Sequence, residues 1–280
     1  VILALFAALW VLLRRSFIRI ATATGQSAKR AYRERAAVRR SVSSALLSKE
    51  LRRFTASPNY MLNCGMGVLL MPLAGFTLLW KGSDIRIALS AALGAEAGAY
   101  LSVMLTAALC MLAAMNDMAA PSVSLEGKSL WIAQSLPVHP WTALRAKLAV
   151  QLILTAPPVL FASVSALFVL RPSLAASVAV VVLPLLYVLL SALFGLMLGV
   201  RNANLVWTNE IIPIKQSVSV MLALLSGWGY AAVFVLGVLF LGAFVSVPVF
   251  AAVFAVLTAA LCILLYRWLR TRGAARFAAL

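Results

Sequence analysis

The feature that most constrains this chain is a series of apolar stretches, each long enough to cross a lipid bilayer. A transmembrane helix needs about 20 consecutive apolar residues. Six stretches meet this requirement, at residues 61–80, 94–115, 148–170, 174–200, 218–245 and 247–269. Because lipid offers the backbone no hydrogen bonds, a spanning segment of this kind is helical. The sequence therefore predicts an all-α integral membrane protein with a six-helix transmembrane bundle.

The composition excludes an ordinary soluble domain. Of the 280 residues, 64% are hydrophobic and only 11% are charged, whereas soluble domains are about half apolar and about a quarter charged. A water-soluble fold of this length exposes too much of its surface to bury so many apolar side chains. Lipid is the solvent that fits this composition.

A shorter apolar run, residues 1–13, opens the chain. As a helix it covers about 20 Å, against a hydrocarbon core of about 30 Å. A signal peptide carries its positive charges before the apolar run, but here Arg14 and Arg15 follow it. We interpret residues 1–13 as a partial membrane helix, so that the sequence begins partway through a span of a longer chain.

The strongly basic balance has two possible explanations. The formal charge is +17, from 24 basic and 7 acidic residues, which suits either a nucleic-acid surface or the enrichment of Lys and Arg in cytoplasmic loops. Twelve basic residues lie between Arg14 and Arg53, and most of the others lie just beyond the ends of apolar runs. This distribution favours membrane topology, and no nucleic-acid partner is expected.

The charges also orient the bundle. A cytoplasmic segment 14–58 places the long connections 116–147 and 201–215 and the tail 271–280 on the cytoplasmic side. Only Lys81, Arg86 and Arg171 then lie outside, out of 24 basic residues. The predicted organisation is a basic linker with an interfacial helix (14–58), a six-span domain (59–270) with a cytoplasmic coupling loop (116–147), and a cytoplasmic tail (271–280).

Residues 44–58 predict an amphipathic helix before the first span. Leu47, Leu51 and Phe54 fall on one face of a helix, and the cations fall largely on the other. Such a helix lies in the membrane interface, with its cations directed to lipid phosphates. An exposed continuation of the linker is the alternative. The residues assigned to this element are Lys49, Glu50, Leu51, Arg52, Arg53 and Phe54.

The connection 116–141 is too apolar for a free linker. It carries Leu130, Trp131, Ile132, Leu136 and Val138, and such a group is costly to expose to water. A short helix near residues 126–135, ended by Pro137, would bury these side chains. The surface that covers them could be the membrane, the ends of the spans, or another protein.

Within this connection, Gly127-Lys128-Ser129 resembles the end of a phosphate-binding loop. The full pattern requires a glycine five residues before Gly127, and that position is Ser122. No apolar strand precedes it either. We therefore expect that the chain does not bind nucleotide, and no cofactor is predicted.

The remaining reactive residues do not form a catalytic or metal-binding pattern. His139 is the only histidine, and Cys64, Cys110 and Cys262 lie in apolar segments without ligand spacing. Glu96 is the only acid within a predicted span, near its outer end, and an intramembrane acid is a candidate for a transport role. We expect no enzyme activity and no metal site in this chain.

Three segments of the chain resemble a known family. The segments are SKELRRFTASPNYMLN (48–63), SLEGKSLWIAQSLPV (124–138) and NLVWTNEIIPIKQ (204–216). Together they look like the permease subunits of ABC-2-type ATP-binding cassette exporters, and in particular like the long putative exporter permeases of bacteria. The resemblance covers about residues 48–270.

This resemblance implies a bacterial cytoplasmic-membrane exporter subunit. An interfacial helix would precede the first span, and a cytoplasmic coupling helix between the second and third spans would dock on a separate ATPase. A homodimer, or pairing with a second permease half, is also implied. The residues that would contact the ATPase are Ser124, Glu126, Gly127, Lys128, Leu130, Trp131 and Leu136.

Other classes of membrane protein stay open on the residues alone. A secondary transporter usually places acids or broken helices near the bilayer midplane, and only Glu96 is available. A lipid-modifying enzyme would need clustered acids or histidines, whereas Asp117, Glu126, His139 and Glu210 are scattered along the sequence. A non-catalytic membrane scaffold is the third alternative.

Overall fold

The computed structural model describes residues 41–93, 97–170, 172–242 and 244–280, together with Ala7, Trp10, Val11, Leu13 and Arg14. The chain divides into two units, Val1–Arg40 and Ser41–Leu280, and only the second is considered below. Most of the predicted partial helix 1–13 and most of the basic linker thus lie outside the described residues. Glu96 and Arg171 also lie outside them.

All regular elements between residues 41 and 280 in the described ranges are helices, as predicted. The elements are α2 (Val42–Ala56), α3 (Pro58–Cys64), α4 (Met66–Leu93), α5 (Ala97–Ala114), η2 (Ser124–Ser129), α6 (Leu130–Ser135), α7 (Pro140–Leu170), α8 (Leu174–Arg201), α9 (Ile211–Lys215), α10 (Val218–Leu241), α11 (Val247–Trp268), η3 (Leu269–Gly273) and α12 (Ala274–Ala278).

Five helical stretches among the described residues are long and apolar enough to cross a membrane. They are Met66–Ala88, Pro140–Leu170, Leu174–Arg201, Ile211–Leu241 and Val247–Ala278. The stretch Tyr100–Ala114 in α5 is apolar but shorter. The all-helical class and the presence of several membrane-length helices are therefore confirmed, and five of the six predicted spans have a counterpart of sufficient length.

Several helices have other limits than the predicted spans. The first span, predicted at 61–80, is divided at Gly65 into α3 and a much longer α4. The third, predicted at 148–170, begins at Pro140. The predicted loop 116–147 thus ends at His139. Hydrophobicity marks only where lipid begins, whereas a helix can continue beyond it when polar side chains such as Lys147 find protein partners.

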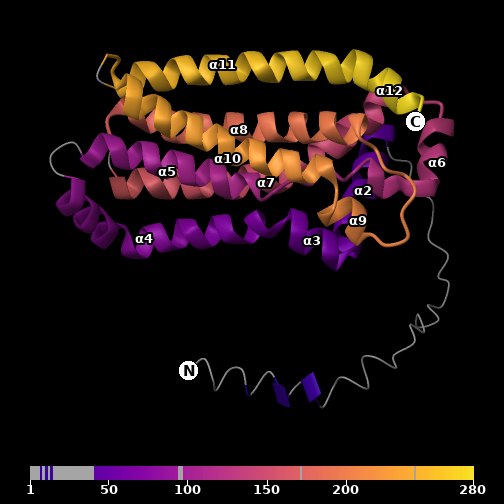
Figure 1. The fold of residues 1–280 in the computed structure, drawn as a ribbon, viewed down its shortest axis with the longest axis horizontal. Coiled ribbons are helices and arrows are strands. Elements are labelled where there is room, and N and C mark those ends of the chain that lie inside the picture. The colour runs from indigo at the N-terminus through magenta and orange to yellow at the C-terminus, as the bar shows by residue number, and fades with distance from the viewer. Residues whose placement is uncertain are drawn as a thin grey trace. The chain divides into compact units, whose positions relative to one another are not determined.

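Helix α8 lies at the centre of the bundle and packs against α5, α7, α10 and α11 (Figure 1). Its apolar stretch is 44% buried within the protein, against 17% for the stretch that begins with α11. Helix α4 packs mainly on α7. Large exposed side chains such as Phe240 and Leu264 cover the outer helices, as expected where lipid is the solvent.

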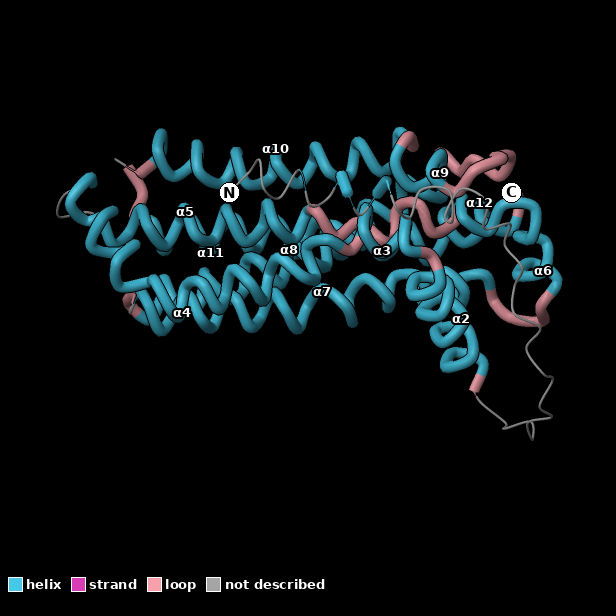
Figure 2. The backbone as a smooth tube through the Cα atoms, turned by 90° about the horizontal axis from the view of Figure 1, so that it is seen from below, coloured by secondary structure: helices cyan, strands magenta, loops and turns pink. Residues whose placement is uncertain are grey.

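The short helices gather at one end of the bundle, which we call the loop end. Helices α2, α6, α9 and α12 lie there in both views (Figures 1 and 2). Figure 2 shows α2 leaving the bundle at a steep angle to the long helices. Hydroxyl side chains begin several helices: Ser41 and Ser57 accept backbone N–H bonds at the first turns of α2 and α3. The loop end therefore carries a folded layer of short helices.

Candidate functional site

A buried cluster of charged residues joins three elements at the loop end. Glu50 comes from α2, Glu126 from η2 and Lys147 from α7, and all three are buried. Lys49 and Arg53, from the same face of α2, complete the cluster from its partly exposed side. We call these five residues the charge cluster.

Glu126 is the centre of the charge cluster. Its carboxylate accepts a hydrogen bond of 2.6 Å from the Arg53 guanidinium and one of 2.7 Å from the Lys147 ammonium. The Lys49 ammonium lies 3.0 Å and 3.1 Å from its two oxygens. Three cations thus surround one carboxylate, and charge-assisted bonds of this length are among the strong ones.

Lys147 connects the parts of the cluster. Besides Glu126, its ammonium donates at 3.0 Å to the Glu50 carboxylate and at 3.0 Å to the Ser122 carbonyl oxygen. An ammonium has three donors, and all three have acceptors here. Arg53 also lies 3.4 Å from Glu50. The buried lysine of α7 is therefore held by α2 and by the 116–139 connection together.

The cluster fixes the protonation state of Glu126. Burial acts to raise the pKa of its carboxyl, but the charge of Lys147 and the hydrogen bond from Arg53 outweigh burial and bring the pKa far below its ordinary value. Burial acts to lower the pKa of the Arg53 guanidinium, but its hydrogen bond to Glu126 and the charges of Glu50 and Glu126 raise that pKa above its ordinary value. Glu126 is therefore a permanent anion, suited to holding elements together rather than to exchanging protons.

The backbone at Gly127 turns sharply just after Glu126. Its φ is 53° and its ψ −138°, a combination that is essentially restricted to glycine. A Cβ here would also lie 3.2 Å from the ring of Trp207. This turn separates the clamped residue Glu126 from Lys128 and α6, which face outward.

The connection between α8 and α10 packs on the same loop. The Trp207 indole N–H donates to the Ser124 carbonyl at 2.7 Å, and the Asn204 backbone N–H donates to the Ser124 hydroxyl at 3.0 Å. Ser57, between α2 and α3, donates to the Glu210 carboxylate at 2.9 Å. All three segments that resemble the exporter family thus meet at the loop end.

Helix α6 presents an apolar surface that no described residue covers. Trp131 is 64% exposed, Ile132 50% and Leu136 42%. Leu130 is buried, and Gln134 donates to the Phe277 carbonyl of α12 at 3.0 Å. The helix is therefore fixed to the bundle on one side, while three large apolar side chains point away from it.

The structure divides the predicted ATPase contacts into two groups. Ser124, Glu126, Gly127 and Leu130 are buried within the chain, whereas Lys128, Trp131 and Leu136 are exposed. Only the second group has side-chain surface to offer a partner. The first group holds the loop in place.

The residues assigned to the interfacial helix also fall into buried and exposed groups. Lys49 and Arg53 were expected to face lipid phosphates, but they donate to Glu126, because a buried carboxylate is a closer partner. Phe54 is buried against Tyr60, with ring centroids 5.1 Å apart. Arg52 is exposed and Leu51 partly buried.

Sequence reasoning missed Lys147 and the roles of Trp207 and Ser122. Lys147 was taken as the last residue of a loop, because it borders an apolar run. A lysine and two glutamates separated by about 20 and 100 residues carry no spacing signal that would pair them. The one available signal was the lone acid Glu126 in an otherwise apolar segment.

A second polar pair, Asn116 and Asp117, follows α5 at the same end. Both side chains are buried, and neither has a hydrogen-bond partner among the described residues. Burial raises the pKa of Asp117 to about 8, and the nearby Ala120 amide acts in the opposite direction. The carboxylate lies against Gly195 of α8, where an added Cβ would come within 2.6 Å. Gly199 of α8 likewise faces this connection, because an added Cβ there would meet the Ala120 carbonyl oxygen.

No three His, Cys, Asp or Glu side chains in the described ranges could share a metal ion. The three cysteines are free and buried, as the sequence indicated. Lys128 points outward and Ser129 donates to the Glu126 carbonyl at 2.6 Å. These residues therefore make no cradle for a phosphate.

In comparisons with protein-family models, curated proteins and solved structures, nothing matches this chain.

Proposed function

We propose that this chain is the transmembrane permease subunit of an ATP-driven exporter of the ABC-2 type, in a bacterial cytoplasmic membrane. In this proposal α5 is a sixth span, so that α4, α5, α7, α8, α10 and α11 form a six-span bundle. The loop end is cytoplasmic, α2 lies at the membrane surface, and η2 with α6 receives the ATPase.

The observation that carries the proposal is the pairing of an exposed apolar surface with a clamped loop. Trp131, Ile132 and Leu136 are exposed on α6, and large apolar side chains are typical anchors of a protein interface. A few residues earlier, Glu126 is bonded to α2 and α7. A force on α6 would therefore reach the long helix α7 without passing through flexible chain.

The charge distribution supports the orientation. Among the described residues from 41 to 280, most of the Lys and Arg side chains belong to segments at the loop end, and Lys81 and Arg86 belong to the far part of α4. Cytoplasmic loops are enriched in Lys and Arg. The basic surface would also favour anionic membrane lipids as partners.

The test is assembly with an ATP-binding cassette ATPase encoded beside this chain. Replacing a tryptophan anchor costs about 2 kcal/mol or more, so Trp131→Ala should weaken co-assembly roughly thirtyfold. Trp80→Ala, an exposed tryptophan of α4, is the matched control and should assemble normally. Purified Trp131→Ala that binds and stimulates the ATPase like the unaltered chain would refute the coupling role of α6.

A second candidate, transport driven by a proton gradient, is favoured by Asp117. This carboxyl is buried without a cation, and its pKa of about 8 would let it bind and release protons near neutral pH. In this case Asp117→Asn would abolish uptake or export driven by a pH gradient in vesicles. In the exporter, Asp117→Asn would leave ATP-driven transport in place.

A further inference from the structure

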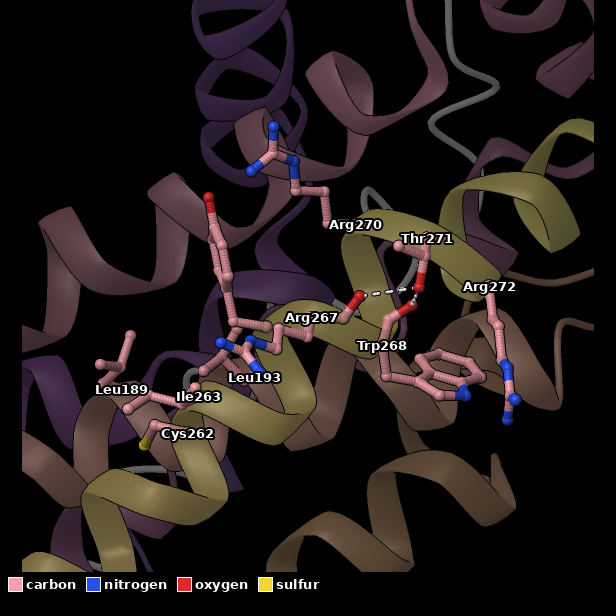
Figure 3. A pocket seen from close by; sticks show the side chains of 10 residues that line it. Leu189, Leu193, Cys262, Ile263, Arg267, Trp268, Arg270, Thr271 and Arg272 are labelled. Carbon is pink, nitrogen blue, oxygen red and sulfur yellow. Dashed lines mark hydrogen bonds between the residues drawn. The ribbon is translucent and has the colours of Figure 1, made fainter.

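A cavity of about 690 Å³ opens at the loop end of α8 and α11 (Figure 3). It is separate from the charge cluster and from α6. Its walls come from the last turns of α11, the π-helical turn η3 and the facing part of α8.

One wall of the cavity is apolar. Leu189 and Leu193 come from α8, and Cys262 and Ile263 from α11. These residues lie inside two stretches of membrane length. In a bilayer this apolar wall would suit contact with lipid acyl chains.

The other wall is cationic. Arg267, Arg270 and Arg272 surround the opening and are exposed. Figure 3 shows them leaving the turn in different directions, with Arg267 nearest the apolar wall. None of the three forms an ion pair with any described acid: the salt bridges found involve other cations, such as Lys49 and Lys81. Their counter-charge must therefore come from outside these parts of the chain.

Arg267 lies in the last turn of α11, and the π-helical turn places Arg270 and Arg272. The i→i+5 turn spans Leu269–Gly273, and such turns interrupt α-helices frequently at functional sites. It is fixed by the buried side chain of Leu269, and the following α12 is held by Arg276, which donates to the Arg201 carbonyl at 3.0 Å. The three arginines thus project from a rigid base.

The dimensions match a molecule with an anionic head and an apolar tail. Seven residues separate Ile263 from Arg270, which corresponds to about 10 Å along a helix. Tyr266 and Trp268 lie between the two walls, and these residue types prefer the level of the lipid headgroups. Basic pockets between spans at the cytoplasmic side are suited to phosphate-bearing lipids.

We propose that this cavity binds one anionic phospholipid, with its headgroup at the opening lined by Arg267, Arg270 and Arg272 and an acyl chain against Leu193 and Ile263. A soluble phosphate would leave the apolar wall open to water, and a zwitterionic lipid would bring a cation close to the three arginines together with its phosphate. The proposal is independent of the exporter assignment.

The experiment is native mass spectrometry of the full chain, purified in neutral detergent and titrated with phosphatidylglycerol or phosphatidylcholine. We expect preference for phosphatidylglycerol and a loss of at least about tenfold in its affinity for Arg267→Gln/Arg270→Gln/Arg272→Gln. The control Arg86→Gln/Arg145→Gln/Lys215→Gln removes the same charge from exposed sites outside the cavity and should keep the preference.

A second pair of variants tests the apolar wall without changing charge. Ile263→Trp fills the cavity and should weaken phosphatidylglycerol binding, whereas its neighbour Leu264→Trp, which does not line the cavity, should not. Unchanged binding by the arginine variant, equal binding of phosphatidylcholine, or equal effects of the two Trp variants would each overturn the proposal. Displacement of the lipid by equimolar inorganic phosphate would instead identify a free-phosphate site and would also overturn it.

Discussion

Glu126 and Asp117 lie nine residues apart in the same connection, and both are buried at the loop end. Glu126 has three cations within hydrogen-bonding distance and its pKa is held far below the ordinary range. Asp117 has none in the described part of the chain, and its pKa rises to about 8. Burial is common to both, so the neighbouring charges decide the opposite outcomes.

The difference assigns different physical roles to the two carboxylates. A carboxylate that stays charged at every physiological pH can only hold its partners, and Glu126 holds α2 and α7. A carboxyl that titrates near neutral pH can change the packing around it. Asp117 lies against α8, the central helix, through Gly195. Glu126 is therefore a structural contact that does not change with pH, whereas the charge of Asp117 depends on pH.

The largest effect that we expect is from Glu126→Gln. The amide keeps the shape of the side chain but removes its charge, so that Glu50 is the one acid left beside Lys49, Arg53 and Lys147 in the charge cluster. Removing one partner of a buried ion pair costs about 3–5 kcal/mol. The unfolding free energy in detergent should fall by that amount. Asp84→Asn, which removes an exposed pair with Lys81, is the control and should cost at most about 1 kcal/mol.

The double variant Glu126→Gln/Lys147→Met sharpens this test. Removing the buried cation together with the carboxylate relieves the uncompensated charge, so the double variant should be less destabilised than the sum of the single variants. Strict additivity of the two losses would show that Lys147 and Glu126 do not act as one cluster.

A smaller effect is expected from pH, and it should depend on Asp117. Its pKa rises from 3.8 to about 8 on folding, so the native state holds a proton that the unfolded state has lost. The contribution of Asp117 to stability should therefore fall as the pH rises from about 4 towards 8, by about 1 kcal/mol per pH unit. Between pH 6 and 8 the total would be about 2 kcal/mol, measured as thermal unfolding in detergent.

Asp117→Asn should remove most of that slope. Tyr60 and Cys64 are the titratable groups of α3 near Asp117; burial raises the pKa of both well above its ordinary value, so neither ionises between pH 6 and 8. Glu126 stays ionised throughout this window because its pKa is lowered, so Glu126→Gln should leave the slope unchanged. An equal slope in the Asp117→Asn variant would contradict the contrast between the two carboxylates.

The sequence predicted the spans far better than the contacts between their ends. Span positions follow from hydrophobicity, a local property, and α8 agrees with its predicted limits within one residue. The start of α7 was missed because Lys147 is stabilised by Glu50 and Glu126 from other elements. The burial of Glu126 was missed for the same reason, whereas the burial of Leu130 agrees with the expectation that a short helix would bury it.

The candidate site was found only in part. Trp131 and Leu136 are exposed, although the sequence indicated that these apolar side chains need a surface to cover them. The cations of α2 were assigned to lipid because their charge suits phosphate equally well. Only the three-dimensional arrangement distinguishes a lipid phosphate from the carboxylate of Glu126.

The smallest expected effect concerns Gly127, which separates the fixed Glu126 from the outward-facing α6. Gly127→Ala would place a Cβ at a positive φ and within 3.2 Å of Trp207, so we expect a loss of about 1–2 kcal/mol in the unfolding free energy. Gly229→Ala in α10 is the matched control, because nothing lies within 4 Å of its Cβ and alanine favours a helix interior by up to about 1 kcal/mol. The two substitutions should therefore change the unfolding free energy in opposite directions.

Because the strained turn adjoins Glu126 and not Asp117, Gly127→Ala should leave the pH slope of stability unchanged. A changed slope would mean that the two carboxylates are coupled through the loop, and the contrast between them would then have to be replaced by a single shared site.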